Sequence, residues 1–433
     1  MNSVGWFDTL PPKWGSRRLK YAAKLANTRS DGRPDGARYL GLENVESWTG
    51  RLVESEVETG SAEDVVGTDS AVNCFERGDV LFGKLRPYLA KAHLAEAPGV
   101  CTSELLVTKP ARDVDGKYLL YVLLNEGFIS LVNSSAFGSK MPRADWDFIG
   151  GVRVPIPPTI TEQQTIVEYL DQETGRLDSL VAEKRRWLDL LEEKRRALVA
   201  EAITRGVNPK SPTKNSGVEW LGKIPATWET RRVKYLFRLA SESAPADHEF
   251  QLLSVYTDIG VRPRKELEAR GNKASSTEDY WMVRPGDIIV NKLLAWMGAF
   301  GVSEYEGVTS PAYDILRPKP GVDSTYYHYL FRCGICFTEF RRRSTGIMDM
   351  RLRLYFDKFG DMRVPFPPLD EQRAIVAYIG KATAKLDALR AATERTIALL
   401  KERRAALIAA AVTGKIAVPT RPASGRNGVA HEN

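Results

Sequence analysis

Two stretches, VRVPIPPTITEQQTIVEYL at Val152–Leu170 and MRVPFPPLDEQRAIVAYI at Met362–Ile379, are nearly the same line of sequence. In each, Val-Pro-x-Pro-Pro excludes helix and central strand, because proline has no N–H to donate and restricts the residue before it. Just after the prolines, Thr161 and Gln164 are spaced as a capping box, and Asp370 is a candidate N-cap in the second copy. The motif therefore predicts, twice, the end of a domain and the start of a helix.

Other landmarks recur in the same order, displaced by roughly 210 residues. LPPKWGSRRLKY at Leu10–Tyr21 matches IPATWETRRVKY at Ile224–Tyr235, and GDVLFGKL at Gly78–Leu85 matches GDIIVNKL at Gly286–Leu293. Matches that keep their order and displacement indicate a tandem duplication. The period is too long for a solenoid, so each copy is predicted to be a domain-sized unit.

Each copy is expected to have the same internal order. Short β-like runs come first, separated by Gly, Asp and Pro; in the first copy they are RRLKYAAKL, RYLGLENV, VLFGKL and VCTSELLV. An aromatic-rich helical stretch follows, around Lys117–Leu131 and Thr325–Phe340. The fold class predicted is α+β, with two tandem α/β domains and a pseudo-two-fold internal repeat.

The helix after the first proline motif is predicted to run over Thr161–Thr204. Alternating steps of three and four residues predict a coiled-coil seam. Its positions are Leu177, Leu180, Lys184, Trp187, Leu191, Lys194 and Leu198, and in the second copy Leu386, Leu389, Thr393, Thr396, Leu400, Arg403 and Leu407. One such helix could equally pack on its own domain. Two matching helices in a duplicated chain favour an antiparallel pair with a domain at each end.

These signals divide the 433 residues into six parts. The two globular domains are expected at 1–158 and 218–368, the long helices at 159–206 and 369–416, a turn-rich linker at 207–217 and a disordered tail at 417–433. The formal charge of +7 is compatible with a polyanionic partner. With no apolar run of membrane-spanning length, no secretory signal at the start and only four cysteines, the expected compartment is the cytoplasm.

The ordered duplication, from Leu10 to about Lys415, resembles the specificity subunit of type I restriction-modification systems. The paired VPIPPTITEQQ and VPFPPLDEQR motifs before long helices carry most of the resemblance. It implies two target recognition domains, each reading half of a bipartite double-stranded DNA site. It also implies that the helices set the spacer and dock two methyltransferase subunits, with restriction subunits as further partners. The target bases cannot be deduced from the sequence.

Motifs for an independent chemistry are missing from the sequence. Neither G-x-G-x-x-G nor a Walker A loop is present, and the GD…K strands lack the acidic residue that a metal nuclease would need two before the lysine. Cys333 and Cys336 with nearby His328 lack a second ligand pair, so buried apolar cysteines are the better interpretation. We therefore expect a non-catalytic chain with neither metal nor cofactor. The alternatives are an enzyme with its own site and an interaction scaffold without a nucleic-acid role.

DNA contact requires cations for phosphates and polar or aromatic groups for base edges. GKLRPYLAK at Gly83–Lys91 and its counterpart at Lys292 combine such groups at a strand end, and basic loops are expected at Phe137–Trp146 and Phe340–Arg353. The alternative for each is a solvated or structural charge. The candidate DNA-binding residues are Lys84, Arg86, Tyr88, Lys140, Arg143, Lys292, Arg341, Arg342, Arg343 and Arg351.

Overall fold

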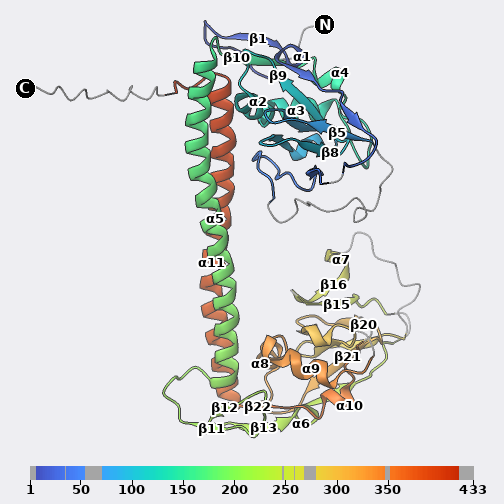
Figure 1. Ribbon diagram of the computed structural model, residues 1–433. Helices are drawn as coiled ribbons and strands as arrows, with labels where there is room; N and C mark the ends of the chain where they lie inside the picture. The colour runs from blue at the N-terminus through green and yellow to red at the C-terminus, as the bar shows by residue number, and fades with distance from the viewer. Residues whose placement is uncertain are drawn as a thin grey trace, which may run out of the picture. The chain divides into compact units, whose positions relative to one another are not determined.

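The computed structural model describes residues 6–34, 36–53, 71–245, 248–257, 259–267, 279–346 and 352–418 (Figure 1). The chain divides into two compact units. Unit 1 comprises Met1–Lys184 and Arg395–Asn433, and unit 2 comprises Arg185–Glu394. The long helices α5 (Ile160–Arg205) and α11 (Leu369–Val412) contribute a segment to each unit.

Unit 1 contains a two-stranded ribbon and two four-stranded sheets. The ribbon is antiparallel and pairs β1 (Gly15–Arg18) with β10 (Arg153–Ile156). One sheet has the order β2 (Ala23–Leu25), β9 (Leu105–Pro110), β6 (Val80–Gly83), β7 (Ala92–Leu94), and the other β3 (Arg29–Ser30), β5 (Val72–Phe75), β8 (Gly99–Cys101), β4 (Tyr39–Leu40). Its shorter helices are α1 (Leu19–Ala22), α2 (Gly116–Leu123), α3 (Glu126–Ser134) and α4 (Trp146–Ile149), with the 3-10 turn η3 (Pro87–Leu89).

Unit 2 is built with a similar pairing order. Its ribbon pairs β13 (Glu229–Arg232) with β22 (Arg363–Phe366), and its four-stranded sheet has the order β14 (Phe237–Ala240), β21 (Tyr313–Pro318), β18 (Ile288–Asn291), β19 (Phe300–Val302). The remaining strand pairs are β11 (Thr213–Asn215) with β12 (Lys223–Pro225), β15 (Leu253–Tyr256) with β16 (Gly260–Pro263), and β17 (Trp281–Val283) with β20 (Gly307–Thr309). Its shorter helices are α6 (Val233–Leu236), α7 (Arg264–Leu267), α8 (Ser324–Phe331), α9 (Phe337–Arg343) and α10 (Phe356–Phe359), with 3-10 turns η4 (Ala295–Met297) and η5 (Gly334–Cys336).

The long helices are part of the hydrophobic core of each unit. In unit 1, Leu170 of α5 and Ile408 of α11 belong to the same buried cluster as the α2 side chains. In unit 2, Ile203 of α5 and Ile375 of α11 are buried with the aromatic residues of α8 and α9. Burying apolar area from both long helices in one core explains why each unit contains a segment of both.

A buried glutamine explains why the proline motif is followed by a helix at a fixed place. The Gln163 Oε1 atom accepts the backbone N–H of Asp115 at 2.8 Å, and its Nε2 atom donates to the Asp113 carbonyl at 3.0 Å. In unit 2, Gln372 Oε1 accepts the Asp323 N–H at 2.8 Å, and its Nε2 donates to the Pro367 carbonyl at 2.8 Å and the Gly321 carbonyl at 3.1 Å. Because Asp115 and Asp323 are the N-caps of α2 and α8, each glutamine ties the start of a long helix to the start of a shorter one.

Buried tyrosines of α2 and α8 fix the strands before the prolines. The Tyr118 hydroxyl lies 3.1 Å from the Pro155 carbonyl and 3.2 Å from the Val412 carbonyl at the end of α11. In unit 2 these contacts come from two neighbouring side chains: Tyr327 donates to Pro365 at 3.1 Å, and Tyr326 donates to Ile203 of α5 at 2.7 Å. The first proline of each motif, Pro155 or Pro365, lies within β10 or β22, and these strands belong to two-stranded ribbons where no N–H of proline is needed.

The predicted helix caps are wrong by a few residues. Helix α5 already begins at Ile160, and the Thr159 hydroxyl, not Thr161, accepts the Glu162 N–H at 3.1 Å. Gln164 is exposed and makes no capping box. In unit 2, Asp370 lies inside the first turn of α11, where the Pro368 carbonyl accepts the first helical N–H groups. Proline loses nothing at a helix start, because an N–H there would have no helical partner.

Each aromatic helical stretch is also divided where the sequence predicts one helix. In unit 1, α2 ends at Leu123 and Asn125 caps α3, since its side chain accepts the N–H groups of Gly127 and Phe128. In unit 2, the turn η5 separates α8 from α9. A local side-chain cap competes with helix continuation, which apolar periodicity does not detect.

Helices α5 and α11 pack together in both units. In unit 2, Arg195 forms an ion pair with Asp387, and Glu192 lies 4.0 Å from Arg390. Residue numbers rise along one helix as they fall along the other, so this segment is antiparallel. In unit 1, Arg404 of α11 lies 3.0 Å from Asp178 of α5 and donates to the Trp48 carbonyl at 2.7 Å.

Six of the nine leucine and tryptophan positions predicted for the seam are buried or half-buried. Leu177, Leu191 and Leu386 are buried, and Leu198, Leu400 and Leu407 are half-buried. Leu180, Trp187 and Leu389, however, are exposed by 36%, 47% and 49%, so they do not belong to the seam. In α5 the neighbouring Val181 and Leu188 take these positions. Counting from Leu177, a step of three residues reaches Leu180 and a step of four reaches Val181, and both positions are apolar. The prediction took the spacing with the larger side chains, Leu180 and Trp187, whereas the structure places the other spacing in the seam.

Two predictions concern the ends of elements. Val418 packs against the unit 1 core, and residues 419–433 of the expected tail lie outside the described residues. The division of the chain into six parts stays a prediction. Among the helices described, none has the length and apolar character required to cross a membrane.

The glutamine contact predicts an unequal response at neighbouring positions. Gln163→Leu leaves the part-buried Asp115 N–H and Asp113 carbonyl without their side-chain partner, which should lower the free energy of unfolding by about 1–3 kcal/mol. Gln164→Leu, at the exposed neighbour, should change it by less than about 0.5 kcal/mol. Urea unfolding of the full chain measures both. Equal losses at the two positions would contradict the anchoring role of Gln163.

Candidate nucleic-acid interface

Two segments distant in sequence form one surface in unit 1, which we call loop pair 1 (residues 84–90 and 137–143). The Arg86 N–H donates to the Pro142 carbonyl at 2.7 Å, and the Ala144 N–H donates to Lys84 at 3.0 Å. Isolated bridges join Arg143 to Leu85 and to Phe137. The pairing of both segments with each other explains why the basic residues predicted from separate motifs lie together.

The first segment of loop pair 1 has unusual backbone geometry. Arg86 and Ala90, on either side of η3, have φ angles of 49° and 47°, in the left-handed region that non-glycine residues avoid. Between them Pro87 is buried, while Tyr88 is 46% exposed. Strained backbone of this kind persists where its surroundings enforce it and is concentrated at functional sites. Here it presents Arg86 and Tyr88 to solvent.

The cations of loop pair 1 have different surroundings. Arg86 and Lys140 are exposed. Arg143 instead forms a bidentate pair with Glu104, with both Nε–O distances at 3.1 Å, and this pairing raises the pKa of its guanidinium. Lys84 is half-buried, and its backbone N–H donates to the Glu104 carbonyl. Of the predicted residues, Arg86, Tyr88 and Lys140 are therefore the best placed for an external ligand.

Loop pair 2 of unit 2 comprises residues 292–298 and 341–354, of which 347–351 lie outside the described residues. The Leu354 N–H donates to the Lys292 carbonyl at 3.0 Å, as Ala144 does to Lys84 in unit 1. A bridge joins Thr345 to Arg353. Arg351, one of the predicted contacts, falls in the part without description.

Lys292 is engaged within the protein. Its Nζ atom lies 3.2 Å from Asp314 and 3.1 Å from the Pro311 carbonyl, with the lysine side chain 20% exposed. Burial raises the pKa of the Asp314 carboxyl, and the neighbouring Lys292 opposes that rise. The arrangement favours a structural ion pair at this position over a phosphate contact.

The three consecutive arginines are not in a loop. Arg341, Arg342 and Arg343 form the last turn of α9, where cations interact favourably with the helix dipole. Glu339 lies 3.1 Å from Arg342 and 2.7 Å from Arg343. The guanidinium of Arg341 lies 5.5 Å from the centroid of the Trp296 ring. Arg342, with a side chain 66% exposed, keeps donors for a ligand, whereas Arg343 is mostly covered.

Exposed apolar side chains, which are absent from the residues predicted to contact DNA, accompany the cations in both loop pairs. Phe137 and Met141 are 66% and 45% exposed in loop pair 1, and Leu293 and Met297 are 41% and 39% exposed in loop pair 2. Apolar residues contact thymine methyl groups or wedge between base pairs in DNA complexes. The sequence pattern that could have indicated Phe137 and Met141 is a Gly-Ser turn with a lysine, flanked by large apolar residues.

The histidine and cysteines considered for zinc have other surroundings. The Val302 N–H donates to His328 Nδ1 at 3.2 Å, and burial lowers the pKa of that ring to about 3. Burial raises the pKa of both Cys333 and Cys336 thiols. Within the described ranges no group of three or more His, Cys, Asp or Glu side chains is placed to hold a metal ion.

Comparisons with known proteins point to one class. The chain is 25% identical over 227 residues to the type I restriction enzyme EcoDI specificity subunit of Escherichia coli, a match that covers 50% of this chain and 49% of that protein. It is 22% identical over 344 residues to the MjaVIII specificity subunit of Methanocaldococcus jannaschii, covering 74% and 75%. The chain thus matches about half the length of the first relative. No family model matches it.

Solved structures show the same fold. A chain from a type I R-M system, studied for complex assembly and conformational transition, has a TM-score of 0.69 at 18% identity and covers 94% of this chain and 100% of its own. The HsdS subunit from Thermoanaerobacter tengcongensis has a TM-score of 0.52 at 19% identity, covering 94% and 99%. The resemblance predicted from the sequence is confirmed: the curated homologues are specificity subunits of type I restriction enzymes, and the structural neighbours are a chain of a type I R-M system and an HsdS subunit.

The Lys292–Asp314 pair predicts a pH-dependent stability loss. Lys292→Met removes the cation that opposes the raised pKa of Asp314, so the folded carboxyl should hold its proton to higher pH than the unfolded one. Stability then falls as pH rises through that interval, and the loss relative to wild type, about 1–3 kcal/mol at pH 7, should shrink towards pH 4.5. Adding Asp314→Asn should remove the pH dependence. A loss that is constant with pH would contradict the ion-pair role.

Proposed function

We propose that this chain is the DNA-reading specificity subunit of a type I restriction-modification complex. Each unit would contain one target recognition domain, and each domain would read one half of a bipartite duplex site. The homologues and the shared fold support this proposal. So does the presence, in each unit, of a loop pair that exposes cationic and apolar side chains next to a rigid core.

The observation that carries the proposal is a contrast between frame and surface. The frame uses similar parts in both units: the ribbon, the four-stranded sheet order and the buried glutamine. The loop pairs differ, with Arg86, Tyr88 and Phe137 exposed in one and Leu293, Met297 and Arg342 in the other. Different surfaces on similar frames suit two different half-sites. We propose an internal repeat with the boundaries predicted from the sequence.

The long helices would set the spacing of the half-sites and dock two methyltransferase subunits. In unit 2, Trp187, Leu190 and Leu389 expose 47%, 55% and 49% of their area on these helices, which suits an apolar protein contact. The chain itself would be non-catalytic, so the methyltransferase subunits would supply the cofactor and the chemistry. Restriction subunits would join the same complex.

A salt titration of DNA binding tests the proposal. The full chain, or its complex with methyltransferase subunits, should bind a labelled duplex with an affinity that falls steeply with salt. Arg86→Ala with Lys140→Ala should lower the slope of log affinity against log salt by about 0.9 for each phosphate that is no longer neutralised. The matched control is Lys24→Ala with Arg77→Ala, which removes two exposed cations from unit 1 outside loop pair 1.

The outcomes separate the alternatives. Wild-type binding without salt dependence, or no binding at all, would contradict a DNA-reading function. An equal drop in slope for the control pair would show that general charge, and not loop pair 1, carries the contact. Methyl transfer by the isolated chain, with contaminating enzyme excluded, would show that it is an enzyme.

A further inference from the structure

Each ribbon places two arginines directly opposite each other, in a part of the sequence that the loop-pair model leaves unexplained. In unit 1 the register of β1 with β10 pairs Arg18 with Arg153. In unit 2 the register of β13 with β22 pairs Arg232 with Arg363. We call these the two arginine ribbons. They lie within the recurring SRRLKY and TRRVKY segments and the recurring proline motifs.

The hydrogen bonds beside each pair show how close the two arginines are. The Leu19 N–H donates to the Val152 carbonyl at 2.8 Å, and the Val233 N–H donates to Met362 at 3.0 Å. These bonds flank the arginine pairs, so each pair is of the non-hydrogen-bonded type, with Cα atoms about 4.5 Å apart and side chains on one face. Like charges directly opposite on a strand pair repel each other. A ligand with negative charge would remove that repulsion.

The unit 1 ribbon is only partly satisfied by its own protein. Arg153 Nη1 donates to the Ser16 carbonyl at 3.0 Å and to the Ser16 hydroxyl at 2.9 Å. Across the described residues, neither Arg18 nor Arg153 has a carboxylate within ion-pair distance, and both are exposed. The neighbouring Arg17 is different, since it pairs with Asp113 at 2.5 Å. The ribbon therefore keeps two cations available on one face.

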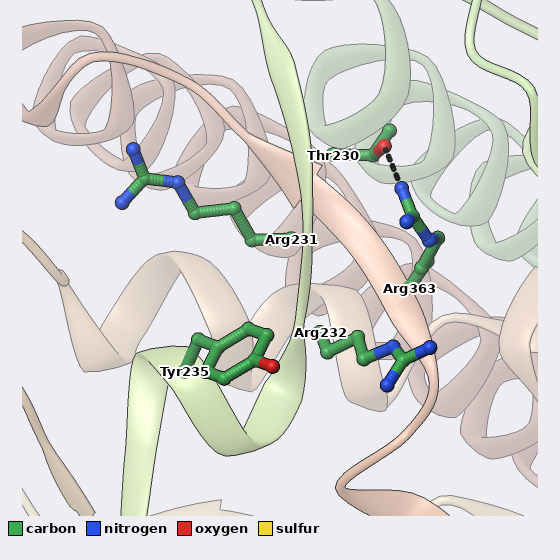
Figure 2. Close-up of a pocket in the computed structure, with 5 residues that line it drawn as sticks. All are labelled: Thr230, Arg231, Arg232, Tyr235 and Arg363. Carbon is green, nitrogen blue, oxygen red and sulfur yellow. Dashed lines mark hydrogen bonds between the residues drawn. The ribbon is translucent and has the colours of Figure 1, made fainter.

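The unit 2 ribbon borders a hollow of about 550 Å³ (Figure 2). It is lined by Thr230, Arg231, Arg232, Tyr235 and Arg363. Figure 2 shows Arg232 and Arg363 extending from neighbouring strands, with the Tyr235 ring on the adjoining helix α6. Arg363 donates to the Thr230 hydroxyl at 3.5 Å, the limit for such a bond. Every side chain of the lining carries an N–H or O–H donor.

The acidic groups near the unit 2 ribbon are shared among several cations. Asp361 lies 3.4 Å from Arg232 and 2.6 Å from Lys234, and Lys234 holds the pKa of this carboxyl below its usual range. Glu229 lies 3.0 Å from Arg231, whose guanidinium also lies 4.0 Å from the Phe366 ring centroid. Arg363 has no carboxylate at ion-pair distance among the residues described. Positive charge remains in excess.

We propose that each arginine ribbon binds a backbone phosphate of the DNA target, outside the base-reading loop pairs; this inference rests on the function proposed above. Guanidinium groups bind phosphate oxygens through two parallel N–H bonds, and serine, threonine and tyrosine hydroxyls complete such contacts. The same residues occur in both units, whereas the loop pairs differ. A contact that is the same at two different half-sites must be made to something that does not vary with sequence, and the phosphate backbone meets that condition.

The composition favours DNA over a docked protein. Protein interfaces have an apolar centre with charged residues depleted from it. The unit 2 hollow instead brings together three arginines, a threonine and a tyrosine, and Tyr235, its one aromatic side chain, carries a hydroxyl. In unit 1, Tyr21 follows Arg18 by the same interval as Tyr235 follows Arg232, and the two rings are 63% and 61% exposed. Exposed hydroxyl-bearing rings beside paired cations suit a solvated polyanion.

The test uses the full chain with a labelled 30-base-pair duplex in a salt titration. Arg18→Gln with Arg153→Gln, and separately Arg232→Gln with Arg363→Gln, should each lower the slope of log affinity against log salt by about 0.9, the contribution of one neutralised phosphate. Arg→Lys at the same positions keeps the charge and should retain the slope. Lys24→Gln with Arg77→Gln, which removes two exposed cations of unit 1 outside the ribbon, should lower the slope less than either ribbon variant does.

The thermal unfolding midpoint of each variant shows whether it is folded. The glutamine variants relieve the repulsion between the paired arginines and lose a few exposed contacts, so they should unfold at a temperature close to that of the wild type. A wild-type slope in both ribbon variants would overturn the phosphate proposal. So would an unchanged slope together with loss of methyltransferase binding in pull-down, which would assign the ribbons to a protein interface. In either case wild-type DNA binding would still stand, so the failure is distinct from failure of the proposed function.

Discussion

The structure depends on one buried amide in each unit. Gln163 and Gln372, 1% and 0% exposed, each bond to the backbone at two points of the turn that begins α2 or α8. Burying an amide is unfavourable unless both its donor and its acceptor have partners, so only one placement of the long helix satisfies the group. That placement fixes the strand before it, because Tyr118 and Tyr327 bond to the carbonyls of Pro155 and Pro365. The proline motif therefore has a fixed position relative to the start of α2 or α8 in each unit.

Because the proline motif is held in place by buried contacts, the side chains of the exposed loop pairs can vary. The loop pairs are attached by backbone hydrogen bonds such as Ala144 to Lys84 and Leu354 to Lys292, which place no demand on side-chain identity. Side chains at Arg86, Phe137 or Met297 can therefore differ without changing the frame. The arginine ribbons are the opposite case, because they combine a surface position with the same residue types in both units. A protein that reads two half-sites needs both kinds of surface.

Sequence patterns predicted the frame well and the surface poorly. The duplicated motif indicated both long helices and the helix-strand class, because prolines and apolar periodicity act locally. Each cap was misplaced by two residues; at the first, Thr159 and Thr161 are equally good caps by composition. The seam was misassigned at Leu180 and Trp187, because both registers of the heptad contain apolar residues. Neither error can be corrected without knowing which neighbour packs on the helix.

The sequence predicted which cations belong to the candidate site, but not which carboxylates pair with them. Lys292, Arg143 and Arg343 were selected as cations, and the structure pairs each with a carboxylate from another segment or turn: Asp314, Glu104 and Glu339. Asp314 and Glu104 lie outside the local sequence window, whereas Glu339 is four residues before Arg343 on the same helix. The arginine ribbons were visible as repeated letters, but their significance depends on strand register, which places Arg18 opposite Arg153 across more than a hundred residues.

The most direct test of the central claim is a map of methylated bases in the genome of the host, with and without this gene. A specificity subunit with two reading units predicts a split motif, two short defined sequences separated by unspecified bases, that is methylated in the parent strain and unmethylated after deletion. Restoring the gene should restore the same motif. An unchanged methylation map after deletion, or the loss of a single continuous motif, would contradict the account.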